Sequence, residues 1–177
     1  MAIGIAGQRL DPVRGYNFLI TFVDSSSAVA TISLGVQNTF LGGFSECSGL
    51  EMALKVDEYN EGGNNGTVLK FPARINWTNI RLKRGAALSG DLWDWHYGFV
   101  EGKGKRRDGV IVLQDDTHTP VKVWSFVRGL PVKWTGPSLN AAQSQLAIEE
   151  IEIAHEGLKV YSKGLVGTVA GIVSSIF

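Results

Sequence analysis

The sequence has few of the residues from which disulfides and metal sites are commonly built, and it has no net positive charge. One cysteine, Cys47, occurs among 177 residues, which excludes an internal disulfide framework and a cysteine-rich zinc site and makes a reducing compartment the natural environment. Cys47 lies among small and apolar residues, so we expect an inert, buried thiol. The 17 basic and 17 acidic residues cancel. Because nucleic-acid binding by general attraction usually needs a net positive charge, we predict no specific nucleic-acid partner.

Motifs for catalysis are missing as well. The three histidines, His96, His118 and His155, are far apart and form no metal-binding spacing such as H-E-x-x-H. Adjacent residues of a strand point to opposite faces, so neither Asp115–Asp116 nor Glu149–Glu150 forms a convincing acid–base pair. We interpret Asp115-Asp116-Thr117 as a hairpin turn. The sequence therefore predicts no catalytic residue, no metal site, no cofactor and no enzymatic activity.

No segment predicts a signal peptide or a membrane span. The N-terminal stretch lacks a basic region followed by a long apolar run. Residues 164–177, GLVGTVAGIVSSIF, are uncharged but shorter than the roughly 20 residues of a spanning helix, and they lack the basic face of a membrane-surface helix. We therefore expect no stable membrane insertion. We interpret residues 162–177 as an apolar extension that docks on a neighbouring component through Leu165, Val169, Ile172, Ile176 and Phe177.

What the chain does contain is the alternation of apolar and polar residues that is typical of β-strands. With 44% hydrophobic residues and 22 glycines, the composition is that of one globular, turn-rich domain. The pattern predicts strands over 16–23, 50–59, 79–84, 109–113 and 121–128, the fourth covered on both faces. Within the second of these, the residues expected to face the core are Leu50, Met52, Leu54 and Val56, and those expected to face solvent are Glu51, Lys55 and Asp57.

The stretch 146–156, LAIEEIEIAHE, admits both a strand and a helix. Its isoleucines favour a strand, whereas glutamate, alanine and the spacing of Ile148, Ile151 and Glu152 are compatible with a helix. We predict the strand. Since Ile148 and Ile151 have opposite parity, we also predict a β-bulge at Glu149–Glu150.

A helix is predicted over about 89–101, with Ser89 as its N-cap and Asp91 in its first turn. One apolar stripe of this helix comprises Leu88, Leu92, Trp95 and Phe99, and a second comprises Trp93, Tyr97 and Val100. A surface helix of a single domain needs only one such stripe, so the second predicts a contact with something else. The expected fold is mainly β: an antiparallel β-barrel or sandwich of about six or seven strands with one flanking α-helix.

The glycine-rich segment EYNEGGNNGT, residues 58–67, separates two predicted strands. It lacks the lysine and the following helix of a phosphate-binding loop, and Glu58 and Glu61 would repel an anion. We interpret it as a connector whose glycines and asparagines suit tight turns with positive φ. The basic segment KGKRR, residues 103–107, leaves open an alternative of a different class, a nucleic-acid-binding β-barrel.

The order of several segments is more distinctive than any single motif: GFSECSGLE, V-x-E-Y-x-EGG, LKFPARINW, NIRLKRG and a helix with LWDW. In this order, over roughly residues 14–160, the chain resembles the contractile phage tail-tube protein family, which comprises T4-type tube proteins and the inner-tube proteins of contractile injection systems. The resemblance implies a β-barrel domain over 14–161, preceded by an N-terminal arm over 1–13, and the extension over 162–177 departs from a minimal tube subunit.

The resemblance also implies a structural function. It implies a homo-oligomer of hexameric rings that stack into a hollow tube, with a sheath protein around it, baseplate or spike hub components at its end and cargo in its lumen. Assembly is expected in the cytoplasm, into a phage-tail-like particle. The residues expected at interfaces between subunits or rings are Glu58, Tyr59, Glu61, Gly62, Gly63, Asn64, Asn65, Trp93, Tyr97 and Val100. The pattern leaves open whether the chain is the main tube protein or a tube initiator that adapts the tube to the baseplate.

Overall fold

A computed structural model describes residues 12–24, 43–63, 66–86 and 90–162. The elements follow one another as β1 (Phe18–Asp24), β2 (Glu46–Ser48), β3 (Met52–Tyr59), β4 (Leu69–Trp77), β5 (Ile80–Gly85), α2 (Asp91–Val100), β6 (Arg107–Gln114), β7 (Pro120–Thr135), β8 (Ile148–Ala154) and β9 (Gly157–Ser162). The prediction of a mainly β fold with one flanking helix is confirmed for this part of the chain. The predicted N-terminal arm and C-terminal extension lie almost wholly outside it.

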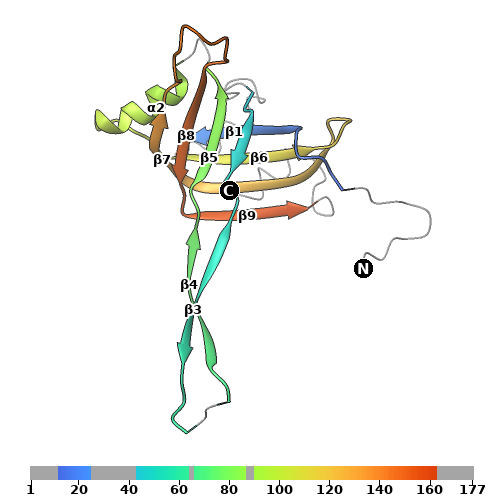
Figure 1. The fold of residues 1–177 in the computed structure, drawn as a ribbon, viewed down its shortest axis with the longest axis vertical. Coiled ribbons are helices and arrows are strands. Elements are labelled where there is room, and N and C mark those ends of the chain that lie inside the picture. Colours follow the sequence, from blue (N-terminus) through green and yellow to red (C-terminus); the bar gives the residue numbers. More distant parts are fainter. Residues whose placement is uncertain (1–11, 25–42, 64–65, 87–89, 163–177) are drawn as a thin grey trace, which may run out of the picture.

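Two antiparallel layers share the long strand β7. Its first half pairs with β6 and β9, and its second half pairs with β8, which continues the sheet to β5 and β2. In Figure 1 the strands β1, β6 and β9 run across the view, while β5 and β8 run along the long axis of the molecule. The two end strands of this sheet, β1 and β2, do not pair with each other among the described residues, so the arrangement is a sandwich and not a closed barrel.

A bulge in β7 lets one strand serve both layers. Arg107 pairs with Gly129 and Gly109 pairs with Phe126, so β7 has one residue more than β6 across this step. Arg128 takes a positive φ of 55° here, and its N–H donates to Oδ1 of Asp108 over 2.6 Å. Because a bulge bends its strand and increases the local twist, β7 leaves the first layer and enters the second at this point.

The main core lies between the two layers, and α2 closes one side of it. Ile20, Phe22, Ile80, Leu82, Leu92, Trp95, Ile111, Phe126, Ile151 and Ile153 form it. Ile20 and Phe22 of β1 and Ile80 and Leu82 of β5 are thus buried, whereas Tyr16, in the stretch predicted as the first strand, precedes β1 and is exposed. A second cluster, Val110, Val112 and Val123, covers the other face of β6 and β7, which confirms that β6 is buried on both faces. The predicted turn after β6 is also confirmed, since Oδ1 of Asp115 accepts from the N–H groups of Thr117 and Thr119.

The strand prediction for β8 is confirmed, but the predicted bulge at Glu149–Glu150 is wrong. β8 pairs with β5 without interruption, from Ile80–Ile153 to Gly85–Ile148. The shift of parity has another cause, because Glu149 and not Ile148 shares the buried face with Ile151 and Ile153. The ladder on the other side of β8, with β7, does contain a bulge, but it lies on β7, between Pro131 and Lys133. A proline in a strand is commonly found at such a position, since it cannot donate to the ladder.

Where it is described, the helix agrees with its predicted stripes but not with its predicted cap, and Leu88 of the first stripe lies outside the described residues. Gly90 and not Ser89 is the N-cap residue, and it provides no side-chain hydrogen bond. Leu92 and Trp95 are buried as expected, whereas Trp93, Tyr97 and Val100 are exposed. No helix in the described part of the chain has the length and hydrophobicity that crossing a membrane requires.

The prediction that Met52, Leu54 and Val56 face the core is wrong. β3 and β4 form a separate two-stranded sheet, and every residue of β3 is exposed. Figure 1 shows these two strands projecting from the body as a long twisted hairpin. We call β3, β4 and their connection, residues 52–77, the arm.

Candidate subunit interfaces: the arm and the aromatic patch

The arm is an outgrowth of a strand pair that begins in the body. Cys47 pairs with Leu82, and Met52 pairs with Trp77. From the first pair to the second, the chain advances five residues from β2 to β3 and goes back five residues from β5 to β4, so no residue is inserted on either side. The β2–β5 ladder therefore continues in the same register into the β3–β4 ladder. Since a strand advances about 3.3 Å per residue, the eight residues of β3 carry the arm roughly 26 Å beyond the body.

Close contacts hold the base of the arm. Gly49 has a φ of +85°, and a Cβ at this position would clash with the carbonyl oxygen of Asn79. Asn79 Nδ2 donates to Glu152 Oε1 over 2.8 Å, which ties the base to β8. The ring of Trp77 lies 5.8 Å from that of His155, whose Nε2 is 3.2 Å from the carbonyl oxygen of Thr78. These contacts connect the arm to the body through fixed geometry on both strands.

One face of the arm near its base is apolar. Directly opposed residues of an antiparallel pair lie on the same face, and three successive such pairs are apolar: Met52–Trp77, Leu54–Ile75 and Val56–Pro72. We call these six residues the apolar ladder. The ladder ends at a cross-strand ion pair, in which Lys70 Nζ lies 3.6 Å from Glu58 Oε1.

The outer part of the arm exposes apolar residues on its other face. Tyr59 pairs with Leu69, Phe71 lies beside them, and all three are exposed. Among the described elements, β3 and β4 have extensive contacts only with each other. An isolated two-stranded hairpin is at best marginally stable in water, and burying apolar surface stabilises by about 25 cal/mol per Å². The arm therefore exposes apolar surface on both faces.

The tip of the arm agrees with its interpretation as a connector. Residues 60–68 join β3 to β4, so Glu58 and Tyr59 of the predicted connector belong to the end of β3, and Gly63 takes the expected positive φ, at 89°. Glu58, Tyr59, Glu61, Gly62 and Gly63 are all exposed. Asn64 and Asn65 lie outside the described residues.

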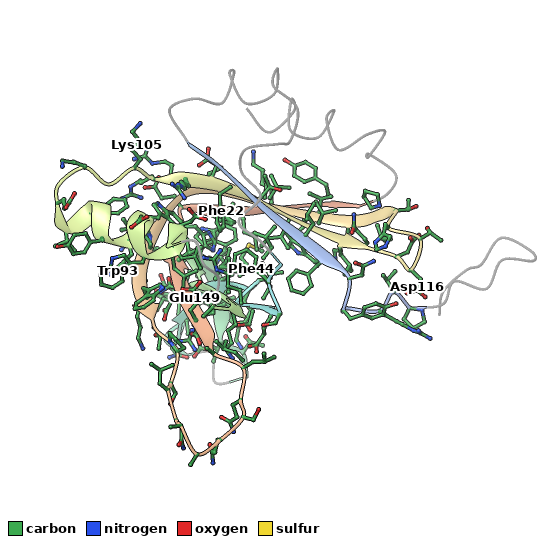
Figure 2. The ribbon with its side chains drawn as sticks, turned by 90° about the horizontal axis from the view of Figure 1, so that it is seen from above. Phe22, Phe44, Trp93, Lys105, Asp116 and Glu149 are labelled. Atoms are coloured by element: carbon green, nitrogen blue, oxygen red, sulfur yellow. The ribbon has the colours of Figure 1, made fainter. Side chains whose placement is uncertain are left out.

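A second exposed apolar surface lies on α2 and the end of β7. The ring of Trp93 stacks on that of Tyr97, with centroids 5.5 Å apart, and meets the ring of Trp134 edge to face at 4.9 Å. Val100 and Val132 are also exposed. We call Trp93, Tyr97, Val100, Val132 and Trp134 the aromatic patch; Figure 2 shows Trp93 beside the helix. Sequence reasoning missed Trp134 and Val132, because the predicted strand ended at residue 128, where the bulge interrupts the alternation.

A buried ion pair supports the aromatic patch from inside. Arg84 Nε donates to Glu149 Oε1 over 2.6 Å, and these side chains are only 2% and 9% exposed. Trp134 Nε1 donates to the other carboxylate oxygen, Oε2, over 3.2 Å. Because the carboxylate accepts from both groups, the pair fixes the orientation of the Trp134 indole. In the sequence, Arg84 is one of three basic residues close together, with Arg81 and Lys83, and Glu149 is part of an acidic pair at a predicted bulge.

The groups considered for chemistry are engaged in packing. Burial raises the pKa of the Cys47 thiol to about 11, with a smaller contribution from the neighbouring Glu46, so the reactive thiolate is scarce at neutral pH. His96 Nδ1 lies 3.0 Å from the carbonyl oxygen of Pro131. In the described part of the chain, no three side chains among histidine, cysteine, aspartate and glutamate are close enough to hold a metal ion.

The basic segment 103–107 also has partners within the chain. Arg106 Nη1 donates to Glu156 Oε1 over 2.9 Å, and Lys103 Nζ lies 3.5 Å from Glu101 Oε2. The Arg107 guanidinium lies over the ring of Trp95 at 5.1 Å. Most of the positive charge that motivated a nucleic-acid alternative is thus balanced or packed.

Comparison with known proteins gives the following matches. The family model described as T4-like virus tail tube protein gp19 matches residues 15–159. A chain in the cryo-EM structure of the anti-feeding prophage baseplate is 24% identical, with a TM-score of 0.75 covering 87% of this chain and 98% of that chain. A chain in the PVC sheath–tube complex, an extracellular contractile injection system in the extended state, is 24% identical, with a TM-score of 0.70 covering 85% and 92%. These likenesses establish a shared fold. A sequence search of curated proteins finds no significant match.

Proposed function

Because the chain belongs to the T4-like virus tail tube protein gp19 family, we propose that it is a structural subunit of the inner tube of a contractile tail or injection system. The subunits assemble as hexameric rings, and the rings stack into a conduit for cargo. The observation that carries this proposal is the arm, which exposes apolar residues on both faces and whose two strands, among the described elements, have extensive contacts only with each other. Such a segment is stabilised when a neighbouring copy covers it.

The aromatic patch serves as a lateral contact in this proposal. Trp93 and Tyr97 bind a neighbouring protomer of the same ring, and Val100 extends that contact. Tryptophan and tyrosine are enriched at protein interfaces, where they bury a large apolar area and still offer a polar group. The arm tip, including Glu58, Glu61 and the glycines after it, contacts a subunit of the same ring or of the next.

The remaining partners follow from the relatives. One similar chain belongs to a sheath–tube complex and another to a baseplate. We therefore propose a surrounding sheath protein and a baseplate component as partners of this tube, within a phage-tail-like particle assembled in the cytoplasm.

Electron microscopy of the purified protein tests the proposal. Rings or tubes of uniform diameter are the expected result. A protein that stays monomeric at high concentration and binds DNA or RNA in a salt-sensitive way would support the nucleic-acid-binding alternative instead.

The tube-initiator alternative is motivated by the residues beyond the family match, which ends at 159. In that alternative, Leu165, Val169, Ile172, Ile176 and Phe177 dock on a baseplate partner. Deleting residues 165–177 separates the two roles. If the segment serves only a baseplate partner, stacking of identical rings persists after the deletion. If stacking is lost, the adapter role is wrong.

A further inference from the structure

The loop between β7 and β8, residues 136–147, contains the two most exposed large apolar residues of the described chain. Leu139 is 84% and Leu146 is 88% exposed. The loop has the sequence GPSLNAAQSQLA and contains no charged residue. Its centre is an organised turn, in which the N–H of Ala142 donates to Asn140 Oδ1 over 3.0 Å and that of Gln143 to the Asn140 carbonyl over 3.2 Å. The two leucines therefore flank a turn of small and amide side chains.

This loop lies at the opposite end of the molecule from the arm. β4 leaves the arm at Trp77, and β5 continues the chain to Gly85, which pairs with Ile148 at the start of β8. The next residue, Ala86, donates its N–H to the carbonyl oxygen of Ala147, the last residue of the loop, over 2.8 Å. At about 3.3 Å per residue, Leu69 and Gly85 are roughly 50 Å apart along this line. Figure 1 shows the arm at the lower end and the loop at the upper end.

We propose that the β7–β8 loop of one copy receives the outer part of the arm of a second copy, so that each ring binds the next through arm-to-loop contacts. This inference rests on the proposed function and names the surface that accepts the arm. Tyr59, Leu69 and Phe71 of the arm pack against Leu139 and Leu146 of the loop.

Charge favours this pairing over a contact between two identical ends. The outer arm carries Asp57, Glu58 and Glu61 against one cation, Lys70, and has a net negative charge. The loop is uncharged, and the charged residue nearest its start is Lys133, which is exposed. An arm brought against a second arm would place like charges together. An arm brought against the loop places its acidic end near a lysine and desolvates no charge of the loop itself.

The geometry also matches what stacking requires. A contact between two different surfaces leaves one free surface of each kind at the ends of every assembly, so that association continues without limit. Arm and loop are at opposite ends of the chain, as a repeat along one axis needs. Contacts of identical surfaces would stop at a pair of rings.

Two variants and their mixture test the inference. The loop variant is Leu139→Ser with Leu146→Ser, and the arm variant is Tyr59→Ser with Phe71→Ser. A matched control is Val160→Ser, which removes an exposed apolar side chain of β9, away from both surfaces. Because the altered residues are exposed and outside the core, each variant is expected to keep the circular dichroism spectrum of the parent. Electron microscopy is expected to show single rings for the loop and arm variants, and tubes for the parent and the control.

The mixture distinguishes arm-to-loop contacts from the other arrangements. Loop-variant rings keep their arms and arm-variant rings keep their loops, so mixing them is expected to give pairs of rings that grow no further. If the mixture contains only single rings, the arm and the loop do not bind each other, and the inference is overturned. Tubes formed by the loop variant alone would also overturn it. In both cases rings still form, so the proposed function stands, whereas a parent protein without rings or tubes would contradict the proposed function itself.

Discussion

The strand pair β2–β5 of the body continues as the pair β3–β4 of the arm. The two parts have the same alternating sequence pattern but differ in how far their apolar residues are buried. β5 in the body and β3 in the arm both alternate apolar and polar residues, and their ladders share one register. Leu82 of β5 is nevertheless 0% exposed, while Leu54 of β3 is 52% exposed. Alternation thus shows that a strand has an apolar face. It does not show whether the same chain covers that face.

Replacing matched phenylalanines gives the largest expected difference between the two regions. Phe22 is 0% exposed and its ring lies 5.3 Å from that of Trp95, so Phe22→Ala is expected to lower the free energy of unfolding by about 3–5 kcal/mol. Phe71 is 53% exposed on the arm, so Phe71→Ala is expected to cost less than about 1 kcal/mol in the isolated protomer. Urea denaturation of dispersed protomers measures both values. Equal losses would mean that the arm packs on its own body in solution.

Removing the buried carboxylate of the body is the next largest change. Glu149→Ala removes the acceptor of both Arg84 and Trp134, and we expect a loss of about 3 kcal/mol in the free energy of unfolding. The environment of Trp134 should change with it, which tryptophan fluorescence and near-ultraviolet circular dichroism would detect. The double variant Arg84→Met with Glu149→Leu is the control. Because it removes both charges and keeps their volume, it is expected to recover most of the stability.

A smaller effect is expected where the arm leaves the body. Gly49 has a positive φ and no room for a Cβ, so Gly49→Ala is expected to cost about 1–3 kcal/mol. Gly62→Ala, at the arm tip, is the matched control, because a Cβ added at Gly62 would have no neighbour within 4 Å and its φ is not positive. Thermal unfolding would measure both. If the two variants unfold at the same temperature, the base of the arm is less constrained than the structure indicates.

Much of the fold could be predicted from local patterns, and the errors have physical causes. Strand positions, the flanking helix and its two stripes follow from periodicity, which depends on each residue and its near neighbours. The orientation of the arm could not be predicted, because the face formed by Met52, Leu54 and Val56 has the same pattern whether its cover is the same chain or another. Glu149 was misassigned for a related reason. A charged residue on a buried face resembles a break in the pattern until its partner, Arg84, is placed opposite it on β5.

The residues of the candidate surfaces also differ in how readily the sequence identifies them. Trp93 and Tyr97 stand out within one helix, so a short stretch of sequence identifies them. Trp134 joins them only because β7 continues past the bulge at Arg128 into the second layer. Leu139 and Leu146 lie in a stretch with no periodicity at all, and only their exposure and their place opposite the arm make them notable.

The smallest expected effect comes from the ion pair of the arm, which is the exposed counterpart of Arg84–Glu149. Lys70 and Glu58 also lie opposite each other on paired strands, but their side chains are 65% and 60% exposed. Solvent screens such a pair, so Lys70→Met is expected to change the free energy of unfolding of the protomer by less than about 0.5 kcal/mol. Urea denaturation at low and high salt would measure it, and a loss above about 1 kcal/mol would mean that the pair is shielded from water. Both pairs join directly opposed residues of paired strands, so the difference between the two losses compares a buried ion pair, including its hydrogen bond to Trp134, with an exposed one.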